Sequence, residues 1–204
     1  MPRLLLVRHG NTDLNTARMF VGHSDVELND AGYRQAERLR ERLAEEKIDL
    51  IYSSDLRRAL ATAEIISTKH KASIIACPEL REINYGRLER LTFEEINCLY
   101  PAVAELCINW NPQLKFPDGE SFDEFKERVG KFLGRLKNHT PEQTILVVAH
   151  GGPLRLILCC LLGIDLWHSR QIRIDLASLS IVDEYPEIAI VSLLNDTSHL
   201  RLGS

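Results

Sequence analysis

The sequence has no apolar run long enough to cross a bilayer, no CxxC pair and no excess of positive charge. Its longest apolar stretch, from Leu156 to Ile164, is nine residues long, whereas a membrane-spanning helix needs about 20. With 25 Lys+Arg against 29 Asp+Glu, the net charge is −4. This balance argues against a partner such as nucleic acid or a membrane surface, which prefers a basic face.

Two further absences bear on where the protein works. The apolar run Leu4–Val7 is too short for a secretory signal, so we expect none. The five cysteines are odd in number, and the adjacent pair Cys159-Cys160 lies in an apolar run. These features predict buried free thiols in a reducing compartment, hence a cytoplasmic protein.

What is present is typical of one globular unit. The chain has 204 residues, 45% of them hydrophobic and 26% charged, with no repeat or low-complexity segment. We expect a single domain over 1–204. The pattern becomes irregular at about 83–120, which predicts a cap-like insertion there. Trp110 and Trp167 are interpreted as packing residues of the cap or core.

Short apolar runs alternate with longer helical patterns along the chain. The expected strands are Leu4–Val7, Ile48–Tyr52, Ile74–Cys77, Thr144–Ala149, Ser178–Val182 and Ile188–Leu194, the last two forming a pair. Helical spacing covers Asp30–Glu46, Leu56–Ile66, a segment from Phe93 that breaks near Pro101, and a segment that starts at Ser121. This alternation predicts an α/β fold, a three-layer α/β/α sandwich with a mostly parallel central sheet.

Three helix starts carry capping residues. Asn29 or Asp30 can cap the first long helix, and Ser54-Asp55 can cap the next. Ser121, with Glu124 three residues later, has the pattern of a capping box.

Two of the predicted strands lead into a histidine followed by glycine. The first gives Arg8-His9-Gly10 and the second gives His150-Gly151-Gly152. In open α/β sheets, ligands bind beyond the carboxyl ends of strands, so both histidines can reach one pocket. Glycine there allows a sharp turn and leaves amide N–H groups bare for an anion.

This set of residues suggests phosphoryl transfer with histidine as the nucleophile. A neutral imidazole can attack phosphorus, and neighbouring arginines favour the neutral form. Arg8, together with Arg57 or Arg58 after the second strand, can bind phosphoryl oxygens two at a time, and these fixed cations make a metal unnecessary. Glu82, just after the third strand, is a candidate general acid. Each residue alone has an ordinary structural interpretation, and only the joint pattern indicates a site.

The chain also resembles the histidine phosphatase superfamily, the phosphoglycerate mutase-like group. Six segments carry the resemblance in the family's order: Arg8 to Asn15, Gly22 to Leu28 with Gly32 and Gln35-Ala36, Ser54 to Ala59 with Thr62-Ala63, Leu80-Arg81-Glu82 with Tyr85-Gly86, Gly119-Glu120-Ser121, and His150-Gly151-Gly152. The resemblance implies a phosphoglycerate mutase-like fold, transient phosphorylation of His9 and proton transfer by Glu82. It also implies phosphoryl binding by Arg8, Arg58 and His150, assisted by Asn15 and by the backbone at Gly22 and Gly151.

The sequence departs from the family pattern at Asn11, Leu88 and Arg90, which we place near the pocket rim, where they bear on substrate identity. The interval from Glu82 to His150, 150 − 82 = 68 residues, is too short for the extra segment of cofactor-dependent mutases. We therefore expect a metal-independent phosphomonoester hydrolase that needs no cofactor.

The expected partner is a small phosphorylated metabolite. The length of the chain and the segment Asp175–Ser180 look most like α-ribazole phosphatase. The protein is expected as a monomer or homodimer. A phosphoglycerate mutase-type reaction stays open. So do a metalloenzyme built on His9, His150 and Glu82 and a non-catalytic phosphoprotein-binding module.

Overall fold

A six-stranded sheet in the order β3-β2-β4-β1-β5-β6 lies at the centre of the protein. The computed structural model describes residues 2–109, 114–185 and 187–201. The strands are β1 (Arg3–Arg8), β2 (Leu50–Ser53), β3 (Ser73–Ala76), β4 (Thr144–Ala149), β5 (Leu179–Glu184) and β6 (Ala189–Asp196). The helices are α1 (Asp13–Thr16), α2 (Asp30–Arg42), α3 (Arg57–Ser67), α4 (Phe93–Leu99), α5 (Pro101–Asn109), α6 (Phe122–Leu136) and α7 (Gly151–Leu162). Short 3₁₀ turns cover η1 (Pro78–Leu80), η2 (Gly86–Leu88), η3 (Leu166–Gln171) and η4 (Ser198–Leu200).

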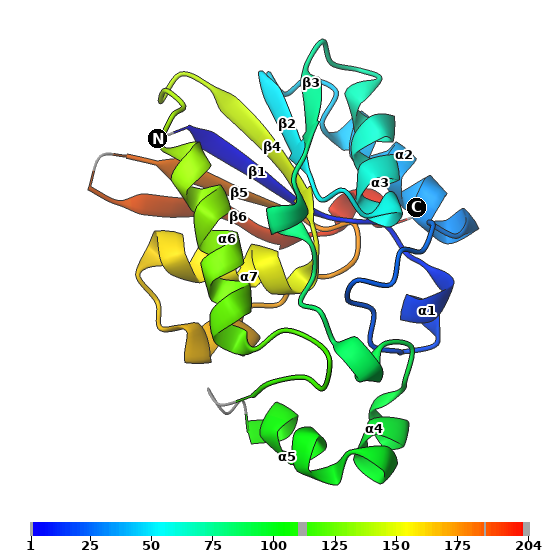
Figure 1. Ribbon diagram of the computed structural model, residues 1–204. Helices are drawn as coiled ribbons and strands as arrows, with labels where there is room; N and C mark the ends of the chain where they lie inside the picture. Colours follow the sequence, from blue (N-terminus) through cyan, green and yellow to red (C-terminus); the bar gives the residue numbers. More distant parts are fainter. Residues whose placement is uncertain (1, 110–113, 186, 202–204) are drawn as a thin grey trace.

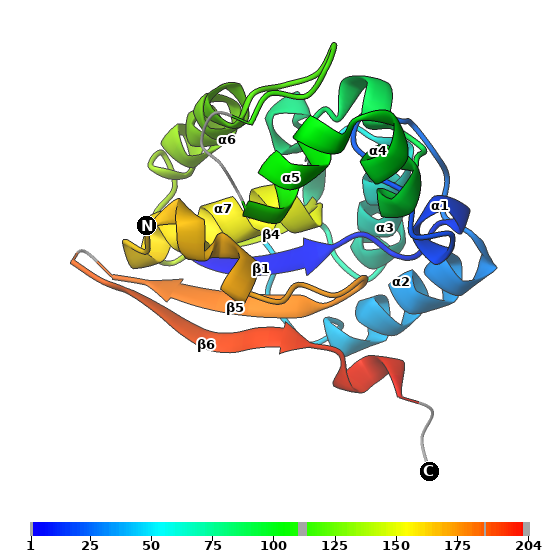
Figure 2. The same ribbon diagram turned by 90° about the horizontal axis from the view of Figure 1, so that it is seen from below.

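The sheet is mostly parallel, as the alternation of strands and helices predicts. Strands β3, β2, β4 and β1 run parallel, and β5 and β6 add an antiparallel edge. Figure 2 shows α2 and α3 on one side of the sheet and α6 and α7 on the other. The expected α/β/α sandwich and the pairing of the last two strands are therefore confirmed.

The buried strand β1 shows why both faces of the sheet need cover. Leu5 and Val7 pack with residues of α2 and α3, whereas Leu4 and Leu6 join the cluster that includes α6 and α7. All four side chains are at most 1% exposed. A strand buried on both faces reads as a continuous apolar run.

Two of the three expected helix caps are confirmed. Asn29 accepts the Gly32 N–H at 2.9 Å, and Ser121 forms its capping box with Glu124. The cap expected at Ser54-Asp55 is wrong, because α3 begins after Leu56 without a side-chain cap. The Ser54 hydroxyl bonds His150 and accepts the N–H of Leu56, which precedes the helix, and the Asp55 carboxylate binds Arg81.

The segment expected as a cap contains α4 and α5. Figure 1 shows these two helices apart from the layers that cover the sheet. The helix from Phe93 ends at Leu99, and Pro101 begins α5 at a position where a missing N–H costs nothing. Trp110 lies outside the described residues. Trp167 in η3 is 47% exposed and joins neither core cluster, so its interpretation as a packing residue is not supported.

Two expectations about apolar residues are corrected or limited by the structure. All five cysteines are free. The prediction of buried thiols is confirmed for Cys77 and Cys159 and is wrong for Cys98 and Cys160, which are exposed. Cys107 is half-buried.

Within the described ranges, no helix has the length and hydropathy that a membrane crossing requires.

Candidate active site

The register of the central strands brings the two histidines together. Arg8 at the end of β1 pairs with Ala149 at the end of β4, so the next residue on each strand, His9 and His150, lies beside the other. Their ring centroids are 4.9 Å apart at an interplanar angle of 60°. Both side chains are almost fully buried. The expectation that two histidines 141 positions apart reach one place is met.

Hydrogen bonding fixes which nitrogen of His9 can react. Nδ1 lies 2.7 Å from the Gly10 carbonyl oxygen, which can only accept, so Nδ1 carries the proton. Nε2 then holds the lone pair, and it accepts the Arg58 Nε–H at 3.3 Å. Burial lowers the pKa of His9 well below its usual value, and the charges of Arg58 and Arg8 add to this effect. The ring is therefore a neutral imidazole whose Nε2 is a potential nucleophile.

Arg58 is held in place by backbone carbonyls. Its Nη1 donates to the Ser24 carbonyl at 2.8 Å and its Nη2 to the Gly22 carbonyl at 2.7 Å. The side chain is fully buried, and burial lowers its pKa to about 10. A guanidinium anchored in this way presents a fixed positive charge beside His9 Nε2.

Glu89, which sequence reasoning missed, organises the loop that holds Arg58. Its carboxylate accepts four backbone N–H groups, those of Gly22, His23, Ser24 and Tyr85, at 2.8 to 3.2 Å. The Gly22 carbonyl therefore holds Arg58, and the Gly22 N–H is bonded to Glu89. A Cβ at Gly22 would lie 2.2 Å from the Ile83 carbonyl oxygen, so this close approach requires glycine.

The half-buried Arg8 and the buried His150 complete this group of cations and imidazoles. Arg8 Nη1 donates to the Ile174 carbonyl at 2.7 Å, and Ser54 Oγ lies 2.8 Å from His150 Nε2. Burial lowers the pKa of both side chains. Within the described part of the chain, Arg8 Nε and His150 Nδ1 are buried without a hydrogen-bond partner. Buried polar atoms left in this state indicate a place for a polar ligand.

Glu82 meets the N-terminus of α7. Its Oε2 accepts the Gly152 N–H at 3.0 Å, and its Oε1 accepts the Ile83 N–H at 3.0 Å. The side chain is 8% exposed. A Cβ at Gly152 would lie 2.1 Å from Glu82 Oε1, so the glycine after the second histidine makes room for the carboxylate. Gly151, the first residue of α7, lies against Arg8, since a Cβ there would be 3.5 Å from Arg8 Cζ.

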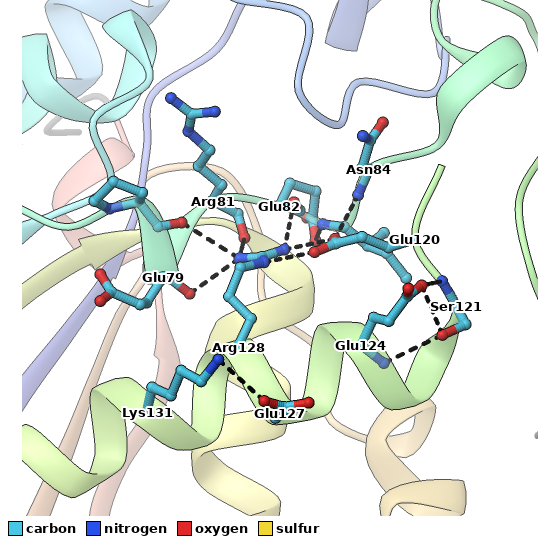
Figure 3. A network of polar contacts seen from close by, with 12 residues as sticks. Glu79, Arg81, Glu82, Asn84, Glu120, Ser121, Glu124, Glu127, Arg128 and Lys131 are labelled. Carbon is cyan, nitrogen blue, oxygen red and sulfur yellow. Dashed lines mark hydrogen bonds and ion pairs between the residues drawn. The ribbon is translucent and has the colours of Figure 1, made fainter. Parts of the chain in front are cut away.

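A second network holds the loop that carries Glu82 (Figure 3). Arg128 on α6 binds the Glu120 carboxylate through Nε at 2.6 Å and Nη2 at 2.7 Å. The same guanidinium donates to the carbonyls of Glu79, Arg81 and Glu82 at 2.9 to 3.1 Å. Sequence reasoning noted Glu120 as part of a motif but did not find Arg128, whose helical position carries no local signal.

Asn15 is one of the residues that line a cavity beside His9 and Glu82. This cavity of about 240 Å³ is lined by Arg8, His9, Asn15, Arg18, Met19, Phe20, Val21, Glu82 and Tyr85. The Asn15 Oδ1 accepts the Thr12 hydroxyl at 2.9 Å. Eight positions expected at the site, namely Arg8, His9, Asn15, Gly22, Arg58, Glu82, His150 and Gly151, thus gather around the ends of β1 and β4.

The three departures from the family pattern have different surroundings. The Asn11 side chain donates to Thr16 Oγ1 at 3.1 Å. Arg90 is exposed and has a positive φ of 65°. The placement of Leu88 at the pocket rim is wrong, because its side chain is fully buried in the core.

A metal centre built on His9, His150 and Glu82 gains no support from the geometry. Among the residues that the structure describes, no group of three or more His, Cys, Asp or Glu side chains is arranged to hold a metal ion. The nitrogen of His9 that could ligate a metal faces the Arg58 guanidinium instead.

Comparison with known proteins agrees with this geometry. A family profile described as the histidine phosphatase superfamily (branch 1) matches residues 4–197. Phosphoserine phosphatase 1 from Hydrogenobacter thermophilus is 32% identical over 98% of this chain and 95% of its own. The Proteus mirabilis protein named probable phosphoglycerate mutase GpmB is 35% identical over the same shares. The crystal structure of the alpha-ribazole phosphatase from Shigella flexneri superposes with a TM-score of 0.89 at 30% identity, over 95% of this chain and 96% of that one. The chain belongs to the histidine phosphatase superfamily, whose members are phosphatases or mutases.

Proposed function

We propose that this protein is a metal-independent phosphomonoester hydrolase that works through a phosphohistidine. The observation that carries the proposal is the fixed tautomer of His9, with Nδ1–H on the Gly10 carbonyl and the Nε2 lone pair beside the Arg58 guanidinium. We assign Arg8 and Arg58 to the charge that develops on the phosphoryl oxygens. Fixed cations of this kind stabilise the transition state without reorganisation.

The reaction has two steps. The lone pair of His9 Nε2 forms a bond to phosphorus as the P–O bond to the alcohol breaks, and protonated Glu82 gives its proton to the leaving oxygen. Water then attacks phosphorus and Glu82 takes up the water proton. The P–N bond breaks, its electron pair returns to Nε2, and phosphate leaves. His150, Asn15 and the N–H of Gly151 are assigned to the phosphoryl oxygens.

Chain length no longer separates hydrolase from mutase. The relative named as a probable phosphoglycerate mutase matches this chain over 95% of its own length. That relative therefore has no room for a long extra segment, and the absence of one here does not exclude a mutase. We favour hydrolysis because two residues that line the cavity beside His9 are open to solvent: Asn15 is half-buried and Arg18 is exposed. Water therefore has a path to phosphorus. The substrate is a small phosphorylated metabolite, and the names of relatives make phosphoserine and α-ribazole 5′-phosphate candidates.

The first test is hydrolysis of p-nitrophenyl phosphate in excess EDTA. In parallel, the enzyme is mixed with ³²P-labelled ester, and the reaction is quenched with acid or with alkali. We expect turnover in EDTA and a protein-bound label that acid releases and alkali does not. Loss of activity on chelation would overturn the metal-independent mechanism. Phosphate release and isomerisation of 3-phosphoglycerate are then measured side by side, and isomerisation without phosphate release would identify a mutase.

A further inference from the structure

A larger cavity adjoins the one that contains His9. It measures about 610 Å³, against about 240 Å³ for the inner cavity, and both are lined by Phe20 and Tyr85. These two rings meet edge to face with centroids 4.9 Å apart, and Tyr85 meets Phe116 in the same way at 5.0 Å. A substrate whose phosphoryl group reaches His9 would extend its alcohol part past this aromatic wall into the larger cavity.

Seven of the nine described residues that line the larger cavity are apolar or aromatic, among them Phe93, Ile108 and Leu114, and the other two are Arg155 and Arg170. Polar atoms nevertheless form nearly half of the surface that these walls expose. The volume falls in the range of about 300–1,000 Å³ that is usual for drug-sized ligands. The three-carbon body of phosphoserine would leave most of these apolar walls in contact with water. A bulky apolar or aromatic group would cover them.

Two arginines interrupt this apolar lining. Arg155 on α7 donates from Nε to the Ile172 carbonyl at 2.8 Å, and its Nη1 lies 3.5 Å from where a Cβ on Gly151 would be. Arg170 in η3 donates to the Ile108 carbonyl of α5 at 2.9 Å. No carboxylate is present among the described residues that line this cavity. A guanidinium has five N–H donors, so each of these arginines can bind an oxyanion of the ligand in addition to a backbone carbonyl.

We propose that the substrate is a phosphomonoester whose alcohol part has a bulky apolar or aromatic body and a second oxyanion, and that Arg155 and Arg170 bind this oxyanion. The inference rests on the hydrolase function proposed above. The planar guanidinium suits a carboxylate, which it can hold through two parallel hydrogen bonds. Specificity then arises where α5, α7 and η3 meet, with Arg155 next to Gly151 and Arg8 of the inner cavity.

The test compares phenyl phosphate, 4-carboxyphenyl phosphate and phosphoserine by kcat/KM. In the wild type we expect the carboxylated aryl ester to be the best of the three and phosphoserine the poorest. The variants Arg155→Gln and Arg170→Gln should lower the preference for 4-carboxyphenyl over phenyl phosphate by about 10-fold each, mostly through KM. Measuring each variant against the wild type removes the difference between the leaving groups.

Arg40→Gln on α2 is the matched control, because it removes the same charge on the helix surface outside both cavities. It should leave the preference unchanged, and Arg170→Lys should restore part of it. If no ester is hydrolysed, the proposed function fails. If the esters are hydrolysed but both glutamine variants keep the wild-type preference, or phosphoserine is the best substrate, the function stands and this inference is overturned. Should Arg155→Gln not fold, Arg170→Gln gives the same test.

Discussion

The two cavities that share Phe20 and Tyr85 are built in different ways. In the inner one, backbone groups hold the charges closest to His9: the Ile174 carbonyl binds Arg8, and two backbone N–H groups bind Glu82. Two backbone carbonyls hold Arg58 beside His9 Nε2. The outer one is walled mainly by rings and aliphatic side chains from α4, α5 and the loops beside them. The difference teaches that groups at strand ends set the chemistry, while the cap helices can vary the substrate.

Replacing the nucleophile tests the inner cavity most severely. His9→Ala should lower kcat for every phosphomonoester by about 10³-fold or more, because no other lone pair replaces Nε2. Circular dichroism and thermal unfolding should show that the fold persists. Activity near that of the wild type, in a folded variant, would remove His9 from the mechanism and with it the contrast between the cavities.

Glu82→Gln separates proton transfer from binding. For alkyl phosphates we expect a loss of about 10²- to 10⁴-fold in kcat, because the alkoxide needs a proton, and a much smaller loss for p-nitrophenyl phosphate. The glutamine can still accept the Gly152 N–H, so the loop should keep its place. Equal losses on both kinds of ester would show that Glu82 acts in positioning and not as an acid.

The buried histidines should make the fold sensitive to mild acid. Burial lowers the pKa of both His9 and His150 well below 6.5, and the charge of Arg58 adds to this. In the unfolded chain both titrate near 6.5, so below that pH the unfolded state binds protons that the folded state does not. The free energy of unfolding should therefore fall as pH falls from about 7 to 5, by up to about 1.4 kcal/mol per pH unit for each histidine.

Urea unfolding at pH 7, 6 and 5 measures this slope. The double variant His9→Gln, His150→Gln should show a shallower one, whatever its stability at pH 7. Parallel slopes for variant and wild type would mean that other groups cause the acid sensitivity. Among these, His23, His70 and His199 also have pKa values lowered by burial and would be replaced next.

Glu89→Gln tests whether the inner cavity depends on groups that do not touch the substrate. An amide oxygen can replace only part of the carboxylate that gathers four N–H groups, so the loop under Arg58 should shift. We expect kcat/KM to fall by about 10- to 100-fold, to the same extent for alkyl and aryl esters. Glu94→Gln, on an exposed position of α4, is the control and should change nothing. A loss that depends on the leaving group would contradict a positioning role.

The sequence predicted the centre of the site better than its supports. His9 and His150 could be placed together because each follows a strand, and strand ends in a parallel sheet meet at one edge. Glu89 could not be found in this way, because its bonds to Gly22 span 67 positions and depend on how two irregular loops fold. Ser54 was assigned to a helix cap, since a serine before a helix usually caps it, but the tertiary contact with His150 prevailed.

The smallest effect is expected at the outer edge of the cap. Arg87 is a cation of the cap-like segment, but its Nε donates to Asp118 at 2.6 Å, and the two side chains are 64% and 68% exposed. Exposed ion pairs of this kind contribute little to stability. Arg87→Gln should therefore leave the melting temperature unchanged within error, and kcat/KM for neutral and carboxylated esters should stay within about 2-fold of the wild type. A selective loss on the carboxylated ester would extend anion recognition from Arg155 and Arg170 to the rim. The outer cavity would then also depend on several charged groups for recognition, and the two cavities would not differ in this respect.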